Sequence, residues 1–192
     1  QLYAMMPAPC AGTPLGELEL RALSVHYITT TFLEHARMAG KGESALVYDI
    51  EADVLRGVGR HVCCPRDGRL GAAYVDTVDG ADNVGMATHM LSYTWGYSLR
   101  DISEALSAWC QRSALDAKRT YIWMCCACVN QHRVKEKERR REAVPFEDFK
   151  GVFEGRVRRI GKVIALMMPW HSPAYLTRSW CMYEMFTAIS SE

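Results

Sequence analysis

The chain has 192 residues, 49% of them hydrophobic, which is enough to bury one core, or one core with an extension. Its formal net charge of +1 creates no field that would attract nucleic acid or an anionic membrane surface, so we expect neither as a partner. No apolar run approaches the roughly 20 residues of a membrane-spanning helix, and no signal peptide is visible at the start.

Two further features of the sequence concern its origin and compartment. The chain begins at Gln1 rather than at a methionine, which indicates a processed chain or a fragment. It contains eight cysteines and no secretory signal, a combination typical of reduced thiols in the cytoplasm. We therefore expect a cytoplasmic protein without disulfides.

The N-terminal part predicts a helical extension of unknown role over residues 1–86. Apolar side chains at helical spacing predict a helix within residues 15–38, and a shorter helix is predicted over residues 45–55. Turn signals then flank a strand-like segment at residues 72–78. A second domain is expected over residues 87–192.

Apolar runs in the second domain predict three buried strands, at residues 88–93, 121–129 and 163–168. Each strand precedes a predicted helix, and Ser98 with Asp101 forms the capping-box pattern that begins the first of them. Alternating strands and helices with continuously apolar strands are typical of a parallel, doubly wound sheet. The expected fold is therefore α/β and flavodoxin-like, with helices on both faces of the sheet.

Ligands of such sheets bind in the crevice outside the carboxyl ends of the strands. The segments expected at those ends are rich in polar and aromatic side chains. The binding residues that this topology predicts are Ser92, Tyr93, Trp95, Gly96, Asn130 and Trp170. The aromatic rings either stack on a base or pack the rim between helices, and Gly96 would let a backbone approach a phosphate.

The last predicted helix, over residues 178–189, carries the main catalytic candidate. Trp180 and Glu184 are four residues apart and share a helix face. A carboxylate held beside an indole suits a cationic, sugar-like ligand or transition state. The alternative is a surface glutamate on an amphipathic helix, and the spacing alone leaves both interpretations open.

Three cysteines lie close together at the end of the second predicted strand. Alternation along a strand would place Cys126 and Cys128 on one face and Cys125 on the other. No second Cys or His pair has zinc-site spacing, so we expect buried, unbridged thiols and no metal. Cys181, near a helix N-terminus, either has a lowered pKa or packs in the core.

A charged segment follows at residues 132–141, with six Lys or Arg and two Glu. A solvated helix start or loop is the interpretation that we favour over a phosphate or acidic-partner site.

Three blocks of the sequence resemble the Toll/interleukin-1-receptor (TIR) superfamily. They are MLSYTWG at residues 90–96, the segment 123–131 and SWCMYE at residues 179–184. The first two are most similar to the fungal heterokaryon-incompatibility relatives, whose strands read LSYxWG and WIDxxCINQ. The resemblance covers about residues 87–190.

The resemblance implies a function for the C-terminal domain. Many TIR domains cleave NAD at the nicotinamide–ribose bond, and their catalytic glutamate matches Glu184. It implies NAD as a nucleotide substrate, no other cofactor, and self-assembly through the domain. Two departures are visible: Cys125 stands where the relatives carry the Asp of WID, and the charged segment replaces the usual loop with Arg-Asp and Pro-Gly. The alternatives are a non-catalytic signalling or assembly module and a nucleotide sensor.

Overall fold

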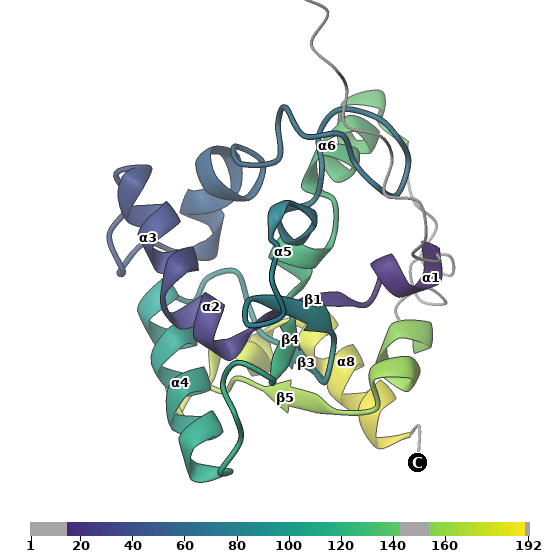
Figure 1. Cartoon of the computed structure of the whole chain (residues 1–192). Helices are drawn as coiled ribbons and strands as arrows, with labels where there is room; N and C mark the ends of the chain where they lie inside the picture. Colours follow the sequence, from purple (N-terminus) through teal and green to yellow (C-terminus); the bar gives the residue numbers. More distant parts are fainter. Residues whose placement is uncertain (1–14, 143–153, 191–192) are drawn as a thin grey trace, which may run out of the picture.

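Five short strands form one mixed sheet in the computed structural model, which describes residues 15–142 and 154–190 (Figure 1). The strands are β1 (Arg21–Ser24), β2 (Val84–Met86), β3 (His89–Ser92), β4 (Tyr121–Trp123) and β5 (Val163–Ala165). Their order across the sheet is β2-β1-β4-β3-β5. The mixed α/β class expected from the sequence is therefore confirmed.

The parallel part of the sheet is the part that the apolar runs predict. β3 lies between β4 and β5 and pairs in parallel with both, so that Met90 is opposite Trp123 on one side and Val163 on the other. The prediction that these three segments are neighbouring parallel strands is confirmed. Their carboxyl ends meet at one edge of the sheet, where the polar and aromatic segments begin.

The second predicted strand is shorter than expected. β4 ends at Trp123, and the cysteines lie in α5 (Cys125–Cys128), a single helical turn. The predicted alternation of Cys126 and Cys128 against Cys125 on a strand is therefore wrong. A short run of small apolar residues suits a buried helical turn as well as a buried strand, and the sequence pattern does not separate the two.

The single helix expected within residues 15–38 is also wrong, because a strand interrupts it. The chain there forms α1 (Leu15–Leu18), β1, α2 (Val25–Thr29) and α3 (Thr31–Met38). The Ser24 hydroxyl accepts a hydrogen bond from the Tyr27 backbone N–H at 3.0 Å, which caps α2 and ends the strand.

The rest of the N-terminal part contains short helical turns. η1 (Val47–Ile50) and η2 (Glu51–Leu55) occupy the place of the second predicted helix. The strand expected at residues 72–78 is wrong, since η3 (Tyr74–Thr77) forms a 3-10 turn there. β1 and β2 pair antiparallel, and β1 also pairs antiparallel with β4, so the sheet continues across the predicted boundary at residue 86.

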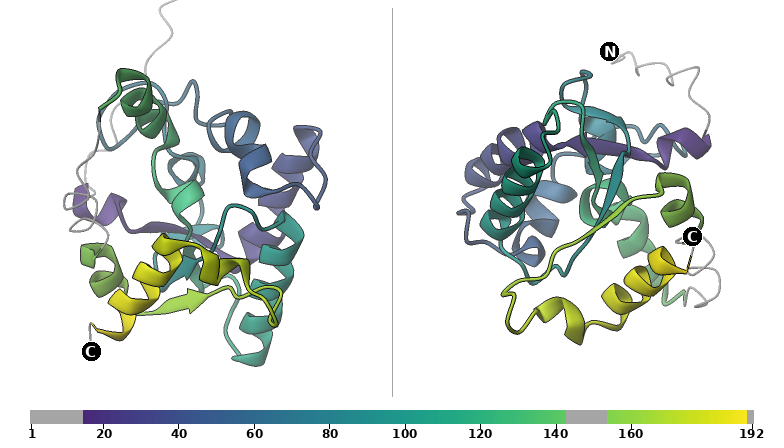
Figure 2. Two further views of the ribbon diagram at one scale, coloured as in Figure 1. Left: turned by 180° about the vertical axis from the view of Figure 1, so that it is seen from behind. Right: turned by 90° about the horizontal axis from the view of Figure 1, so that it is seen from below.

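Helices cover both faces of the sheet (Figure 2). The longer ones beyond residue 87 are α4 (Leu99–Arg112), α6 (Gln131–Arg140), a helix over residues 154–160 and α8 (Ser179–Ile189). α2, α3 and α4 lie on one side, while α8 and the 154–160 helix lie on the other. Within the described ranges, no helix has the length and apolar character of a membrane span.

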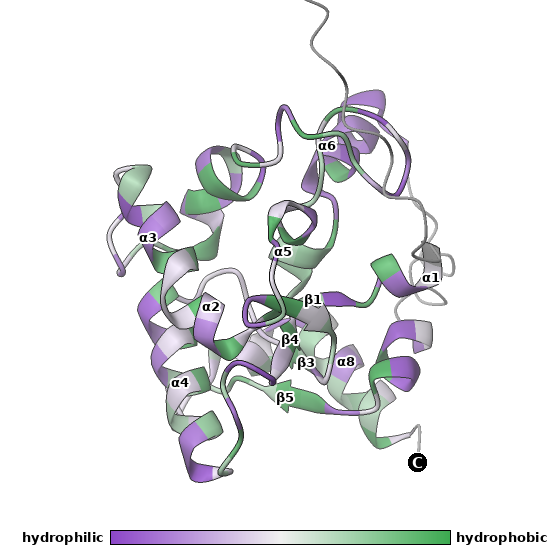
Figure 3. Cartoon of the chain, viewed as in Figure 1, coloured by the Kyte–Doolittle hydropathy of each residue, from purple (hydrophilic) through white to green (hydrophobic). Residues whose placement is uncertain are grey.

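One apolar core includes side chains from both parts of the chain. Leu23 of β1 and Val47 of η1 belong to the same buried cluster as Met90 of β3 and Ile122 of β4. Colouring by hydropathy shows apolar strands inside and a largely hydrophilic α6 outside, which agrees with a solvated charged segment at residues 132–141 (Figure 3). Residues 15–86 therefore contribute to the packing that positions the edge of the sheet.

Candidate functional site

Glu184 lies on the inward face of α8. The helix buries Cys181 and Thr187, three residues before and after it, and this spacing turns Glu184 toward the sheet. Its carboxylate accepts a hydrogen bond from the hydroxyl of Ser92, which is the last residue of β3 and is fully buried. The structure therefore brings the main catalytic candidate to the carboxyl end of the central parallel strand.

Ser92 is also the middle of a short chain of hydroxyl contacts. Its Oγ lies 2.7 Å from the Tyr175 hydroxyl, and Tyr175 donates to the backbone carbonyl of Cys181 at 2.8 Å. Tyr175 comes from η4 (Ala174–Thr177) and is fully buried. Strand β3, η4 and α8 are thus joined by oxygen–oxygen contacts that end on Glu184.

The number of protons in this chain depends on the ionisation of Glu184. With the carboxylate ionised, Ser92 and Tyr175 supply two hydroxyl protons for three contacts. With Glu184 protonated, a third proton is present and every contact has a donor. When the carboxylate ionises, Ser92 donates to Glu184 and Tyr175 donates to Cys181, so the Ser92–Tyr175 contact is left without a proton.

Burial of the carboxyl group raises the pKa of Glu184 to about 7, and the hydrogen bond from Ser92 opposes that rise. No ion pair to Glu184 forms among the described residues. An acid whose pKa lies near neutrality and which has no structural counter-charge is typical of a functional carboxylate.

Removing the Ser92 hydroxyl is expected to raise the pKa of Glu184 further. The Ser92→Ala variant loses the one donor that stabilises the ionised form, while the burial of the carboxyl group remains. A titration of Glu184 followed by ¹³C NMR should show a higher midpoint than in the wild type. A midpoint that is unchanged or lower would show that Ser92 does not donate to the carboxylate.

Cys125 begins α5, just after the end of β4. Its thiol accepts a hydrogen bond from the Trp95 indole N–H at 3.3 Å and lies 3.8 Å from the Tyr93 hydroxyl. Burial raises the pKa of the Cys125 thiol, and the negative charge of Glu184 adds to that rise. Cys125 is therefore a neutral thiol close to Glu184 and not an activated nucleophile.

The predicted aromatic residues do not form one platform. Trp95 is half-buried and lies beside Cys125, with the exposed Gly96 next to it. Tyr93 is buried in the core, so its ring is not available to stack on a ligand. Trp170 is 87% exposed and makes an edge contact with His171 at 6.0 Å. The side chain of Trp180 is outside the described part of the structure.

Asn130 has a structural role. Its side-chain oxygen accepts hydrogen bonds from the backbone N–H groups of His132 and Arg133, which caps α6. Its amide nitrogen donates to the Gly71 carbonyl at 2.9 Å. Both ends of the amide are thus occupied away from Glu184, and the structure gives Asn130 no part in the group around that carboxylate.

Most of the other thiols in the described part of the chain are buried, and Cys63 is partly exposed. Cys126 and Cys128 are each 1% exposed, as expected, whereas Cys125 is partly exposed. Burial raises the pKa of Cys181 to about 11, which corrects the option of a lowered pKa there. Among the described residues the cysteines are unbridged, and no three His, Cys, Asp or Glu side chains are placed to hold a metal ion.

Two residues that contact Ser92 or Trp95 give no signal in the sequence. Tyr175 reaches Ser92 across 83 residues, and only the packing of η4 against β3 brings the two hydroxyls together. Tyr48 of η1 packs on Trp95, with ring centroids 5.6 Å apart. Both contacts are long-range in the chain, so neither a motif nor a spacing predicts them.

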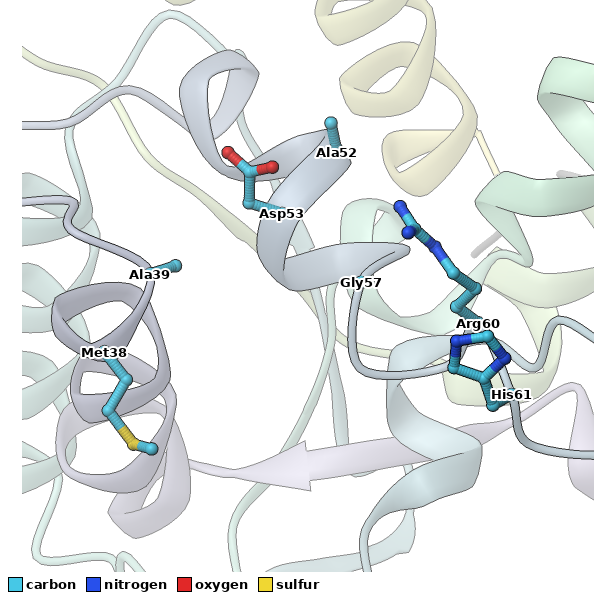
Figure 4. Close-up of a pocket in the computed structure, with 7 residues that line it drawn as sticks. All are labelled: Met38, Ala39, Ala52, Asp53, Gly57, Arg60 and His61. Carbon is cyan, nitrogen blue, oxygen red and sulfur yellow. The ribbon is translucent and has the colours of Figure 1, made fainter.

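A separate open pocket of about 470 Å³ lies between the end of α3 and η2 (Figure 4). Asp53 lines one wall, and Arg60 and His61 line the pocket from the loop that follows η2. Asp53 already pairs with Lys41 at 3.4 Å. None of the predicted site residues lines this pocket, so Glu184 remains the candidate site.

No protein-family model, curated protein or solved structure matches this chain.

Proposed function

We propose that the protein is a TIR-like NAD glycohydrolase in which Glu184 is the catalytic carboxylate. The observation that supports this most directly is the position of Glu184 at the carboxyl end of β3, partly buried, bound to Ser92 and without an ion-pair partner among the described residues. That end of a parallel sheet is where ligands bind. A carboxylate placed there stabilises positive charge that develops on a bound sugar.

The proposed reaction needs one carboxylate. The C1′–N bond of the nicotinamide riboside breaks, its electron pair goes to the pyridinium nitrogen, and nicotinamide leaves as a neutral group without a general acid. The ribose becomes oxocarbenium-like, and ionised Glu184 stabilises that cation. Water then adds to C1′ and gives up a proton, which Glu184 is placed to accept.

Ser92 and Tyr175 position Glu184 in this scheme. Ser92 donates to the carboxylate and is itself held by Tyr175, so two buried hydroxyls fix the orientation of the acid. Burial leaves little water to solvate the ionised carboxylate. The electrostatic attraction between this carboxylate and a cation that forms beside it is therefore strong. The raised pKa of Glu184, about 7, leaves a large ionised fraction at neutral pH.

The finer fold assignment is also a proposal. The parallel order β4-β3-β5 with helices on both faces supports a TIR-like, flavodoxin-like core, to which β1 and β2 add an antiparallel edge. Self-assembly through this core and a nucleotide as the small-molecule partner are the further expectations that the resemblance brings.

A non-catalytic assembly module or nucleotide sensor is the second candidate. Cys125 favours this candidate, because it is a neutral thiol where the similar fungal proteins carry an aspartate. The predicted aromatic residues also favour it, because they do not lie together as one stacking surface. Tyr93 is buried, and Trp170 is 87% exposed with its ring against His171. The same position of Glu184 would then bind a ribose without cleaving it.

Chromatography of wild-type protein incubated with NAD separates the two candidates. The glycohydrolase proposal expects nicotinamide and ADP-ribose to appear in equal amounts, above the level in a protein-free sample. The protein should be tested over a wide concentration range, because an assembly-dependent enzyme is silent when dilute. Absence of nicotinamide at the highest concentration would favour the assembly module or sensor.

A further inference from the structure

We propose that Tyr48, Trp95 and Arg178 form a recognition edge beside Glu184, which binds the phosphate and base of a nucleotide. This inference rests on the proposed function, because it assigns the part of the substrate that does not react. It also gives a role to the N-terminal part of the chain, since Tyr48 belongs to the predicted extension over residues 1–86. The site would therefore select phosphorylated nucleotides over free nucleosides.

Backbone pairing fixes the recognition edge. Leu46 and Ser98 form an isolated antiparallel bridge, and the Val47 N–H donates to the Tyr97 carbonyl at 3.3 Å. The Tyr48 N–H donates to the Trp95 carbonyl at 3.4 Å. The segment before η1 thus lies along the loop that follows β3, so that Tyr48 is held on Trp95 instead of being free in solution.

Tyr48 offers an aromatic surface. Its side chain packs on Trp95 at a tilt of 57°, yet Tyr48 remains 52% exposed. An exposed ring that is held by a second aromatic residue is a ready stacking surface for a base, because little side-chain freedom is lost on binding. The indole of Trp95 is fixed in turn by its hydrogen bond to Cys125, which lies beside Glu184.

Arg178 offers a positive charge. Its guanidinium donates to the Tyr48 hydroxyl at 3.5 Å, and no carboxylate in the described part of the chain pairs with it. The residue is exposed and precedes Glu184 by six positions at the start of α8, about 9 Å along the helix axis. An unpaired arginine is suited to a phosphate, which it binds with two parallel hydrogen bonds.

The charges of Arg178 and Glu184 both act on the thiol of Cys181. Burial raises the pKa of the Cys181 thiol, the negative charge of Glu184 adds to the rise, and the positive charge of Arg178 opposes it. Arg178 and Glu184 lie three residues before and three residues after Cys181, so they flank the same part of α8. NAD with its nicotinamide ribose at Glu184 would extend its diphosphate toward Arg178 and its adenine, beyond the diphosphate, toward Tyr48.

Binding of ADP-ribose, AMP and adenosine, measured by calorimetry, tests this inference without any turnover. The wild type should bind ADP-ribose and AMP at least tenfold more tightly than adenosine. Arg178→Gln should lose about tenfold or more in affinity for the two phosphorylated ligands and little for adenosine. Tyr48→Ala should weaken all three ligands by a similar factor through lost stacking, while Tyr48→Phe should keep most of the affinity.

Two controls keep the result specific. Arg112→Gln removes an exposed arginine at the end of α4 and should leave all three affinities unchanged. Circular dichroism should confirm that each variant is folded. Equal affinity of the wild type for AMP and adenosine, no binding of ADP-ribose, or an Arg178→Gln variant with unchanged affinities would each overturn the inference. Nicotinamide release by the wild type is a separate result, so failure of this inference and failure of the glycohydrolase proposal are distinguishable.

Discussion

Replacing Glu184 by glutamine is expected to lower the rate of nicotinamide release from NAD by about a hundredfold or more, while the affinity for ADP-ribose stays close to that of the wild type. Glutamine keeps the shape of the side chain and an oxygen that accepts the Ser92 hydrogen bond. It removes the negative charge, which matters most when the ribose becomes cationic. The loss should therefore appear in kcat, measured by single-turnover kinetics, and not in binding.

The matched control is Glu104→Gln, the same exchange at an exposed position of α4. It should leave both kcat and affinity unchanged. A Glu184→Gln variant that turns over as fast as the wild type would place the chemistry on another residue. A variant that loses affinity and rate together would indicate a role for Glu184 in ground-state binding.

The same substitution is expected to stabilise the fold above neutral pH. Burial raises the pKa of Glu184 from 4.5 to about 7, so the folded state holds a proton that the unfolded state has lost between these values. The stability associated with the protonated group is complete below pH 4.5 and is lost as the pH rises through about 7. Glutamine, which does not ionise, removes a penalty of up to about 3 kcal/mol at pH 8, less the cost of burying its amide.

Urea unfolding at pH 4.5 and pH 8 measures this effect. The difference in unfolding free energy between Glu184→Gln and the wild type should become more positive from the lower to the higher pH, and Glu104→Gln should show no such change. Glu184→Gln would then stabilise the fold and abolish the charge needed for the reaction. Such a trade-off between stability and activity is expected of a catalytic acid. A difference that is independent of pH would mean that Glu184 titrates as an ordinary exposed glutamate.

Local signals in the sequence were sufficient for the parallel half of the fold. The apolar segments at β3, β4 and β5 and the capping box of Ser98 and Asp101 are local patterns, and the structure contains all four. β1 was not predicted because its four residues continue a helical spacing of apolar side chains. Its pairing with β2 and β4, at 60 to 100 positions further along the chain, overrides that local preference.

The candidate site was only partly predictable for the same reason. Topology predicts Ser92, Asn130 and Trp170 at strand ends alike, and the structure brings Ser92 to Glu184. Asn130 instead caps α6, a local use of its side chain that competes with ligand binding. Tyr175 reaches Ser92 and Tyr48 reaches Trp95 through tertiary packing, which no local pattern contains.

The pH dependence of single-turnover nicotinamide release by the wild-type protein tests the central claim most directly, namely that ionised Glu184 carries the chemistry. The rate should rise with pH, reach half its maximum near pH 7 where Glu184 titrates, and then remain constant. Its midpoint should agree with the ¹³C titration of Glu184 in the same protein. A rate that falls as the pH rises through 7, or one that does not follow the titration of Glu184, would contradict the account.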